Sequence, residues 1–572
     1  MSGFSQISLT ELRLIVPMII VVITGIAVLM LEVFHRSAAS KAYLAWFTVL
    51  GLVFALGDTM YLSGVGTSAF AMSQMLYIDG FGLAFDAVVL IGAILATLIA
   101  PSYLASHRLA RGEYYGLLLF SLTGMMVMNH AADLFMVFMG LELMSIPIYA
   151  MAGFFRHQSQ SAESSMKYFF LGAFASALFL YGIAFIYGLT GTTSLVGVSR
   201  VMFAGLGGVD AGSAQAFATS SGFVELVGTA AGQAPVFQME FLPAVAILLI
   251  LVAMTFKVAM VPFHMWTPDV YTGAPTSAVG FMATGVKAAA FAALIRVFVV
   301  AFYDQPARLS DTGWLSVLFW LALASMILGN VVAIIQTSVK RMLAYSSIAH
   351  AGYIMVGVIA ATYAPQNFIQ MDAVIFYALA YTFGTIGAFG VLAWFGKRGE
   401  EATTYEDLSG LARKHPAVAF AMTIFMLSSA GIPPTAGFLA KFTIFKSAVQ
   451  TGEHLLVVLS VVGVLASVCG VYYYLKVILS LYMKSPRREV AAIGGLEIKT
   501  GLIACVFGTL LFGIVPGAGL DLARGSVMSF LGAPPVVRVE LNKAQQKVGA
   551  HALLGGPVVP VGAAADDPEN CE

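Results

Sequence analysis

Charged residues are scarce in this 572-residue chain: they make up 10% of it, whereas 59% of its residues are hydrophobic. The 29 basic and 29 acidic residues cancel, which excludes a strongly basic nucleic-acid-binding protein. Cysteine is nearly absent too. Cys469, Cys505 and Cys571 are isolated and form neither a CxxC pair nor a Cys/His cluster with metal-ligand spacing. We therefore expect no iron–sulfur, haem or zinc site.

Nucleotide-binding motifs are also missing. The chain contains neither GxGxxG nor the phosphate loop GxxxxGK(S/T). If the protein takes part in energy conversion, electrons and nucleotides must be handled elsewhere. We accordingly expect this chain to bind no cofactor and no metal.

Apolar runs of about 20 residues recur from end to end, and the mean hydropathy is +0.90. In lipid such runs satisfy their backbone hydrogen bonds only as helices, and the alternating pattern of a membrane barrel is absent. The sequence thus predicts an all-α polytopic membrane protein. We expect about fourteen transmembrane helices, at residues 14–34, 42–63, 82–105, 115–130, 132–154, 164–189, 241–262, 276–302, 313–336, 343–363, 370–396, 416–449, 455–483 and 499–520.

Basic residues of the connecting loops predict the topology, because they are enriched on the cytoplasmic side. One set of alternate loops holds Arg36, Lys41, Arg108, Arg111, Arg156, Lys340, Arg341, Lys397, Arg398, Arg413, Lys414, Lys484, Arg487, Arg488 and Lys499. The opposite set holds little beyond Arg200, Arg308 and Lys446. With an even number of spans, both termini are predicted on the non-cytoplasmic side.

Two stretches lack the apolar pattern. Residues 191–240 are rich in Gly, Ala and Ser and nearly uncharged, which indicates an external loop or lateral insertion. The tail from 534 to 572 has no amphipathic period and ends in acidic residues, so we expect it to be disordered. We assign no chemistry to either stretch.

Against this background, four lysines and a glutamate inside the predicted spans need an explanation. They are Lys167, Lys257, Lys287, Lys441 and Glu142. A lysine at the bilayer centre costs about 2.5–3.5 kcal/mol, so four cost on the order of 10 kcal/mol. Such residues are functional candidates by default.

Glu142 and Lys167 lie on consecutive predicted helices. A carboxylate in lipid must be neutral or paired, and a nearby ammonium is the least costly partner. We therefore predict that Lys167 pairs with Glu142. A static structural pair is the alternative, and Lys167 is also near enough to the cytoplasmic end to extend its ammonium toward water.

The other three lysines have no acidic neighbour in sequence. A desolvated lysine near other cations is shifted toward neutrality, which lets it take up and release a proton. Lys257 lies just before Pro262, and Lys441 lies just after Pro433 and Pro434. Proline breaks helices, and broken helices in two halves of a transporter point to an ion site. Lys257, Lys287 and Lys441 are thus predicted to relay protons.

His264 follows in a turn-rich segment and either relays protons or caps the broken helix. Lys340, Arg341, Ser346, Ser347 and His350 are assigned to a cytoplasmic helix junction, where topology alone explains the cations. Asp58, Asp86, Asp133 and Arg296 lie near predicted span ends and are expected to be interfacial. Two roles stay open for Lys476: its ammonium extends to water, or its side chain lines a proton path.

Four segments resemble the antiporter-like membrane subunits of respiratory complex I. They are GLELMSIPIYAMAGF, FKVAMVPFHMWTPDVYTGAPT, VKRMLAYSSIAHAGY and SSAGIPPTAGFLAKF. The motif WTPDVYTGAP most resembles the subunit N branch of that family. The resemblance is clearest from about Gly140 to Tyr482 and fades over 191–240 and after about 535.

This resemblance implies fourteen helices with two inverted five-helix repeats, each containing a broken helix. The expected organisation is helices 1–3 in 1–114, the repeats in 115–302 and 303–484, the last helix in 485–533 and the tail in 534–572. The family's glutamate corresponds to Glu142, its partner lysine to Lys167, and its broken-helix, central and distal lysines to Lys257, Lys287 and Lys441. In some sister subunits of this family, a glutamate stands at the position of the distal lysine, which is Lys441 in this chain.

The function that the resemblance implies is proton translocation in NADH:quinone oxidoreductase in a bacterial inner membrane. NADH, FMN, iron–sulfur clusters and quinone would then be bound by other subunits. The expected partners are other membrane subunits of complex I, including sister antiporter-like subunits, together with lipid and protons. Two alternatives remain: a subunit of a multi-subunit Na+/H+ antiporter, and a scaffold whose lysines only bind neighbours or lipid.

Overall fold

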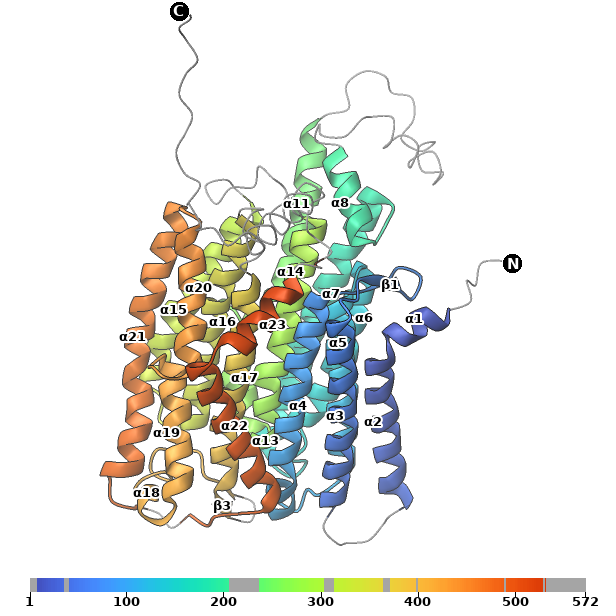
Figure 1. Ribbon diagram of the computed structural model, residues 1–572. Coiled ribbons are helices and arrows are strands. Elements are labelled where there is room, and N and C mark those ends of the chain that lie inside the picture. Colours follow the sequence, from blue (N-terminus) through green and yellow to red (C-terminus); the bar gives the residue numbers. More distant parts are fainter. Residues whose placement is uncertain are drawn as a thin grey trace, which may run out of the picture. The chain divides into compact units, whose positions relative to one another are not determined.

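The apolar runs fold into helices, as expected for backbone that must bond internally in lipid (Figure 1). The computed structural model describes residues 8–34, 41–204, 236–302, 313–363, 371–397, 400–487, 490–527 and 530. The helices of the first half are α1 (Leu9–Leu14), α2 (Val16–Phe34), α3 (Ala42–Gly64), α4 (Gly80–Ser106), α5 (Glu113–His130), α6 (Leu134–Ala152), α7 (Ser159–Thr190), α8 (Leu195–Ala204), α11 (Val236–Lys257) and α12 (Trp266–Gly273). Those of the second half are α13 (Thr276–Phe281), α14 (Lys287–Arg296), α15 (Trp314–Ile334), α16 (Val339–Tyr363), α17 (Met371–Trp394), α18 (Leu411–Lys414), α19 (Pro416–Ala430), α20 (Ala436–Gln450), α21 (His454–Met483), α22 (Leu496–Ile514) and α23 (Gly517–Val527).

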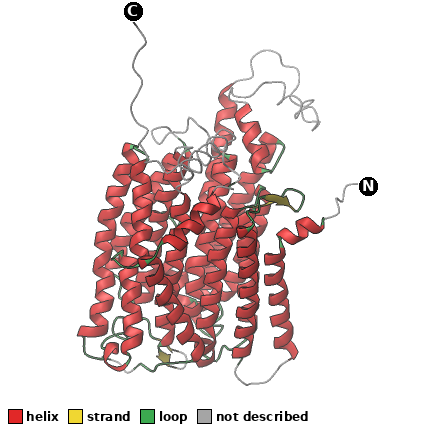
Figure 2. Ribbon diagram, viewed as in Figure 1, coloured by secondary structure: helices red, strands yellow, loops and turns green. Residues whose placement is uncertain are grey.

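The all-α membrane fold is confirmed. In the described ranges, eleven helices are long and apolar enough to cross a membrane, and each matches a predicted span. The three remaining predicted spans contain α5, α11 and the pair α19 and α20. The total of fourteen and the two inverted repeats stay predictions. Figure 2 shows how little of the described chain is strand or loop.

Two strand pairs lie outside the membrane helices. Strands β1 (Ala69–Ala71) and β2 (Leu76–Ile78) pair antiparallel between α3 and α4. Strands β3 (Gly396–Lys397) and β4 (Glu400–Glu401) form a second antiparallel pair after α17. The second pair places Glu401 beneath the helix bundle, next to the start of α16.

Two predicted spans are interrupted near their lysines. The span expected at 416–449 is divided between α19 and α20, and Gly431 between them has a φ of +85°, a conformation that glycine adopts without strain. The span expected at 241–262 ends early, because α11 stops at Lys257, and the turn-rich segment that holds His264 contains the short helix α12. The turn prediction was therefore incomplete, because α12 packs against α7 and α16 and gains tertiary contacts that local propensity does not report.

One continuous membrane helix is built from four consecutive segments. It comprises α13, a π-helical turn η1 (Met282–Val286), α14 and a second π-helical turn η2 (Val297–Ala301). We call this Thr276–Ala301 unit the central helix, because its whole length is buried. Single π turns inside α-helices occur often at functional sites, and here they flank Lys287 and Arg296.

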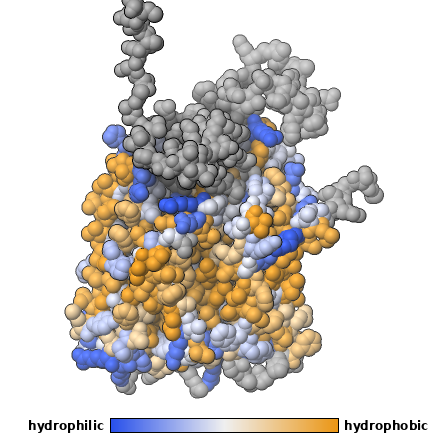
Figure 3. All heavy atoms as spheres, in the orientation of Figure 1, coloured by the Kyte–Doolittle hydropathy of each residue, from blue (hydrophilic) through white to orange (hydrophobic). Residues whose placement is uncertain are grey.

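The inner helices are buried, whereas the outer ones expose apolar side chains. The central helix, α4, α16 and α17 are almost wholly buried, while α2, α3, α7, α21 and α22 present apolar residues outward. Figure 3 shows hydrophobic residues over the middle of one face and hydrophilic residues near its two ends. This distribution fits a bilayer around the bundle.

The two ends of the bundle differ in charge. We call the end that holds Lys41, Arg108, Arg111, Arg156, Arg413 and Lys414 the basic end, and the other the far end. The basic end is the lower one in Figure 1. The described residues belong to one compact unit, and the predicted tail 534–572 lies outside them. Of the predicted loop 191–240, residues 205–235 lie outside them as well.

Candidate functional site

Burial separates the four predicted lysines into two groups. Lys257, Lys287 and Lys441 are buried, with 1%, 3% and 7% of their surface exposed, whereas the Lys167 side chain is 43% exposed. The three buried lysines come from α11, the central helix and α20, which are far apart in sequence. We call these three the lysine row.

Lys257, the last residue of α11, bonds to α6. Its Nζ donates to Ser145 Oγ at 2.8 Å and to Tyr149 OH at 3.1 Å. Glu142 lies three residues before Ser145, so Glu142, Ser145 and Tyr149 share one face of α6. A Cβ at Gly172 of α7 would lie 2.0 Å from Tyr149 OH, so this glycine leaves room for the hydroxyl that Lys257 contacts.

Lys287 begins α14, directly after the π turn η1. Its Nζ donates to the carbonyl oxygen of Ser347 at 2.7 Å and to Ser347 Oγ at 2.5 Å. Both partners are uncharged groups of α16. The lysine is thus held by neutral acceptors in a buried environment, where a charge is costly.

Lys441 reaches back to the end of α19. Its Nζ donates to the carbonyls of Ser429 and Ala430, at 2.8 and 3.2 Å, and to Ser467 Oγ at 2.7 Å. Carbonyls at a helix C-terminus carry the negative end of the helix dipole, which favours a cation. The break at Gly431 creates this site, because it ends α19 within reach of a lysine on α20.

A polar stripe on α16 joins Lys287 to Lys441. Ser347, His350 and Tyr353 follow one another at three-residue spacing on a buried helix. His350 contacts Tyr377 OH at 2.6 Å through Nδ1 and Tyr474 OH at 3.2 Å through Nε2. Lys441 Nζ lies 5.1 Å from the centre of the Tyr353 ring. The stripe therefore begins at one lysine and ends at another.

The sequence analysis missed this stripe by assigning Ser347 and His350 to a cytoplasmic junction. That assignment was wrong because α16 starts at Val339 and carries both residues two to three turns into the bundle, where they are buried. Polar residues at helical spacing within an otherwise apolar segment were the signal that could have found them.

The predicted Glu142–Lys167 pair was also wrong. Lys167 Nζ instead contacts Glu163 Oε1 at 2.7 Å and Asp269 Oδ2 at 2.9 Å, while Glu142 Oε1 is buried without a hydrogen-bond partner. Two closer carboxylates explain the difference: Glu163 lies one turn earlier on α7, and packing of α12 on α7 brings Asp269. Asp269 also contacts Arg341 Nη1 at 3.3 Å.

His264 and Lys476 have local roles in the structure. The carbonyl of His264 accepts a hydrogen bond from Thr267 N at the start of α12, whereas its Nδ1 is buried without a partner. Its predicted part in a relay stays a prediction. Lys476 Nζ lies 4.5 Å from the centre of the Tyr405 ring and 3.4 Å from the carbonyl of Gln336.

At the basic end, Lys340, whose side chain is 1% exposed, forms an ion pair with Glu401, whose side chain is 17% exposed, at an N–O distance of 2.6 Å. Glu401 also accepts hydrogen bonds from Tyr103 OH, Thr276 N and Thr276 Oγ1. Burial by itself raises the pKa of Glu401, but the Lys340 ammonium and these hydrogen bonds hold the pKa below its ordinary value. A cytoplasmic position therefore does not by itself explain why a lysine is present at 340. Through its ion pair, Lys340 ties α16 to the start of the central helix.

Asp86 and Arg296 were predicted to be interfacial, near span ends; this membrane depth stays a prediction, but both residues are buried inside the bundle, with 1% and 0% of their surface exposed. They belong to a polar cluster at the far end, where α4, α5 and the central helix meet. Arg296 pairs there with Asp79, and Asp86 contacts His130. Asp133 caps α6 by accepting from Phe135 N, and Asp58 pairs with Arg13 at a more exposed position.

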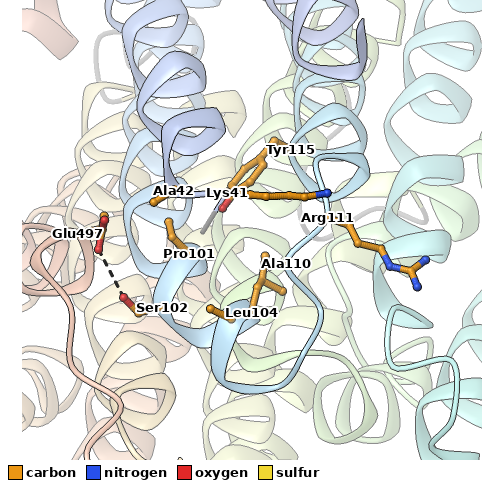
Figure 4. A pocket seen from close by; sticks show the side chains of 10 residues that line it. Lys41, Ala42, Pro101, Ser102, Leu104, Ala110, Arg111, Tyr115 and Glu497 are labelled. Carbon is orange, nitrogen blue, oxygen red and sulfur yellow. Dashed lines mark hydrogen bonds between the residues drawn. The ribbon is translucent and has the colours of Figure 1, made fainter. Parts of the chain in front are cut away.

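A separate cavity of about 140 Å³ lies at the basic end between α3, α4 and α5. Lys41, Arg111, Tyr115 and Glu497 are among its lining residues, and Ser102 Oγ lies 3.4 Å from Glu497 Oε2 (Figure 4). The lysine row does not line it. Within the described residues, no group of three or more His, Cys, Asp or Glu side chains is placed to hold a metal ion.

Comparison with known proteins places these residues in a family context. The family described as NADH:quinone oxidoreductase/Mrp antiporter, TM, matches residues 131–467, which include Glu142 and the whole lysine row. NADH-quinone oxidoreductase subunit N of Trichlorobacter lovleyi is 41% identical over 518 residues, covering 90% of this chain and 97% of that relative.

Two solved structures are similar as well. A chain of respiratory complex I from Thermus thermophilus with bound aureothin matches with a TM-score of 0.68 and 32% identity, covering 89% of this chain and all of that one. A chain of the Mrp complex from Dietzia sp. matches with a TM-score of 0.72 over 92% of this chain and 99% of its own. At 21% identity, the Mrp match shows a common fold alone.

Proposed function

The chain belongs to the family of NADH-quinone oxidoreductase subunit N, and on this basis we propose that it carries protons across the membrane as one subunit of that complex. The observation that carries the proposal is the lysine row, which is buried within a membrane bundle and bonded to uncharged groups. Ionisable residues at such depth are costly and are kept where protons or ions move.

The contacts suggest an order for the pathway. Glu142 lies on the face of α6 whose hydroxyls contact Lys257. Helix α11 packs against α14, which carries Lys287, and the α16 stripe then leads to Lys441. Hydroxyl groups and imidazole both donate and accept hydrogen bonds, so they suit proton transfer between lysines.

Electrostatic repulsion supplies a means of moving the proton. Neighbouring like charges disfavour each other's protonation, so a charge change at one end of the row passes along it as successive changes in proton affinity. Transport against the membrane potential requires about 2.3 kcal/mol per charge per 100 mV. In this proposal quinone reduction in other subunits supplies that free energy, and this chain contains no redox centre.

Partners and orientation follow from the same proposal. NADH, FMN, iron–sulfur clusters and quinone are bound by other subunits, and sister antiporter-like subunits are neighbours in the membrane. The basic end faces the cytoplasm of a bacterial inner membrane, and both termini lie on the other side. The apolar outer faces of α2, α3, α7 and α21 are available for lipid and for those neighbours.

Substitution of the lysines tests the proposal. NADH oxidation and proton uptake are measured together in inverted membrane vesicles for wild type, Lys257→Ala, Lys287→Ala and Lys441→Ala, with assembly checked on native gels. We expect assembled variants to transfer fewer protons per NADH. Normal coupled turnover with a normal proton yield in all three would show that the lysine row does not pump.

A subunit of a multi-subunit Na+/H+ antiporter is the second candidate, supported by the shared fold of the Mrp chain. Sodium-dependent proton exchange in vesicles without NADH and quinone would favour it. The sequence relationship to subunit N spans nearly the whole chain at 41% identity, and it favours the first candidate.

A further inference from the structure

Asp86 of α4 and His130 of α5 form a buried contact at the far end, with 2.9 Å between Nε2 and Oδ2. The second ring nitrogen, Nδ1, lies 3.2 Å from the carbonyl oxygen of Tyr77. The other carboxylate oxygen of Asp86 accepts from Asn129 Nδ2 at 2.9 Å. Asp86 and His130 are each about 1% exposed, so water does not compete for these contacts.

These contacts require a proton between the two residues. A carbonyl only accepts hydrogen bonds, as does an ionised carboxylate, whereas a neutral imidazole has a single N–H to donate. If His130 were neutral and Asp86 ionised, one of the two ring nitrogens would carry no hydrogen. Its lone pair would then face an oxygen that can only accept. Both contacts are satisfied when His130 carries two protons or when Asp86 itself is protonated. Either way the pair holds one extra proton.

The charged groups around the pair balance the positive charge of this extra proton. Asp79 caps α4 through Gly82 N and pairs with Arg296, whose Nε donates to the carbonyl of Asn129 at 2.5 Å. With the extra proton, two carboxylates face one guanidinium and one imidazolium, so the buried cluster is neutral. Without it, the cluster has one uncompensated negative charge. Burial of a net charge is unfavourable, and the proton relieves it.

The cluster adjoins a cavity. A hollow of about 410 Å³ is lined by Ser63, Thr67, Gly80, Asp521 and Ser526, among others, and Gly80 follows Asp79 directly in sequence. The Asp521 side chain is 77% exposed, so the cavity borders the surface. Within the cluster, Asp79 Oδ2 and Arg296 Nη1 are buried without hydrogen-bond partners. Polar groups with unused hydrogen-bonding capacity thus belong to the residue next to Gly80 in sequence and to its partner Arg296.

We infer that the Asp86–His130 pair is a proton-binding site serving the far-end opening of the pathway, reached through the cavity beside Gly80. The inference rests on the proposed function. Arg296 links the pair to the central helix, on which Lys287 lies nine residues earlier, so a change of charge in the cluster acts on the helix that carries the central lysine. Asp79, Asn129 and Arg296 are positioning residues for the pair.

Other charged groups at this end belong to neighbouring elements. Asp521 and Arg524 lie on α23, and Arg524 contacts Asp372 of α17 at 3.2 Å. Asp133 is the N-cap of α6 and accepts from Thr193 Oγ1. All four are outside the hydrogen-bond network of the Asp86–His130 pair, so removing the pair's charges tests that network specifically.

The test uses the whole complex in proteoliposomes, with NADH oxidation and proton transfer measured from pH 6 to 8.5. The variants are Asp86→Asn, His130→Gln and the double variant, in which two amides keep hydrogen bonds without any titratable group. Asp58→Asn, which removes one charge from the more exposed pair with Arg13, is the control. Lys287→Ala measures the full loss from this subunit.

We expect the double variant to assemble, to oxidise NADH and to lose as much proton yield as Lys287→Ala at every pH, while Asp58→Asn resembles wild type. A full proton yield in the double variant, together with a loss in Lys287→Ala, would overturn the site and leave the proposed function standing. Failure of the double variant to assemble would also overturn it, because the pair would then be structural. An unchanged yield in Lys287→Ala would count against the proposed function itself.

Discussion

Lys287 Nζ donates to two oxygens of one residue, the carbonyl and the hydroxyl of Ser347. The carbonyl can only accept, whereas the hydroxyl can accept a hydrogen bond from the ammonium and donate one of its own. The carbonyl therefore positions the lysine, and the hydroxyl offers the proton a way onward to the α16 stripe. This division of roles within one residue can be tested.

Ser347→Ala removes the hydroxyl and keeps the carbonyl. A hydrogen bond to a charged group contributes about 1.5–3 kcal/mol, so we expect proton retention on Lys287 to weaken by about tenfold or more. The complex should assemble and transfer fewer protons per NADH. Ser121→Ala is the matched control, because the Ser121 hydroxyl is buried without a partner. Equal proton yields in the two variants would contradict the role of the Ser347 hydroxyl.

His350→Gln interrupts the stripe between Lys287 and Lys441. Glutamine keeps some hydrogen bonding to Tyr377 and Tyr474 but cannot bind a proton near neutral pH. We expect a proton yield as low as that of either lysine variant, with assembly retained on native gels. His454→Gln, at an exposed helix start, should behave as wild type. Normal pumping by His350→Gln would remove the imidazole from the pathway.

Gly172→Ala would place a methyl group 2.0 Å from Tyr149 OH and push this hydroxyl away from Lys257. Overpacking of this kind costs about 1–3 kcal/mol, so assembly should decrease modestly. The assembled fraction should have a lower proton yield, measured as before. Gly188→Ala on the same helix meets nothing within 4 Å and should leave both quantities unchanged. A defect of equal size in Gly188→Ala would point to helix propensity instead.

Glu401→Gln removes the charge that compensates Lys340. Breaking a buried pair by removing one partner costs about 3–5 kcal/mol, so the thermal unfolding midpoint of the complex should fall at neutral pH. Because the folded-state pKa of Glu401 is lowered from its ordinary value of about 4.5, its stabilising contribution is complete above that value. The contribution disappears as the pH falls through the lowered pKa.

The difference in midpoint between wild type and Glu401→Gln should therefore shrink on acidification. The exposed pair of Arg487 and Glu406 supplies the control, since such pairs contribute at most about 1 kcal/mol. Glu406→Gln should change the midpoint little at any pH. A constant difference between wild type and Glu401→Gln down to strongly acidic pH would show that the carboxylate charge is not responsible.

The membrane helices and the candidate lysines were open to prediction from the sequence. An apolar run of sufficient length must be a helix in lipid. Whether a run is long and apolar enough depends only on the residues of that run, so it can be judged before the fold is known. A lysine inside such a run is costly wherever the helix packs, so Lys257, Lys287 and Lys441 stand out before any fold is known. Pro433 and Pro434 likewise mark the break before Lys441, because proline lacks a backbone donor.

The partners of these charges were decided by tertiary structure. Ser347 is 60 residues from Lys287, and Asp79 is 217 residues from Arg296. Glu142 and Lys167 are close in sequence and yet have different neighbours, because α12 packs on α7 and brings Asp269 to the lysine. The sequence by itself determined which residues are costly in a membrane. Only helix packing decided which groups form hydrogen bonds and ion pairs with these residues. Such contacts form between the faces of neighbouring helices, and no local sequence pattern specifies which faces meet.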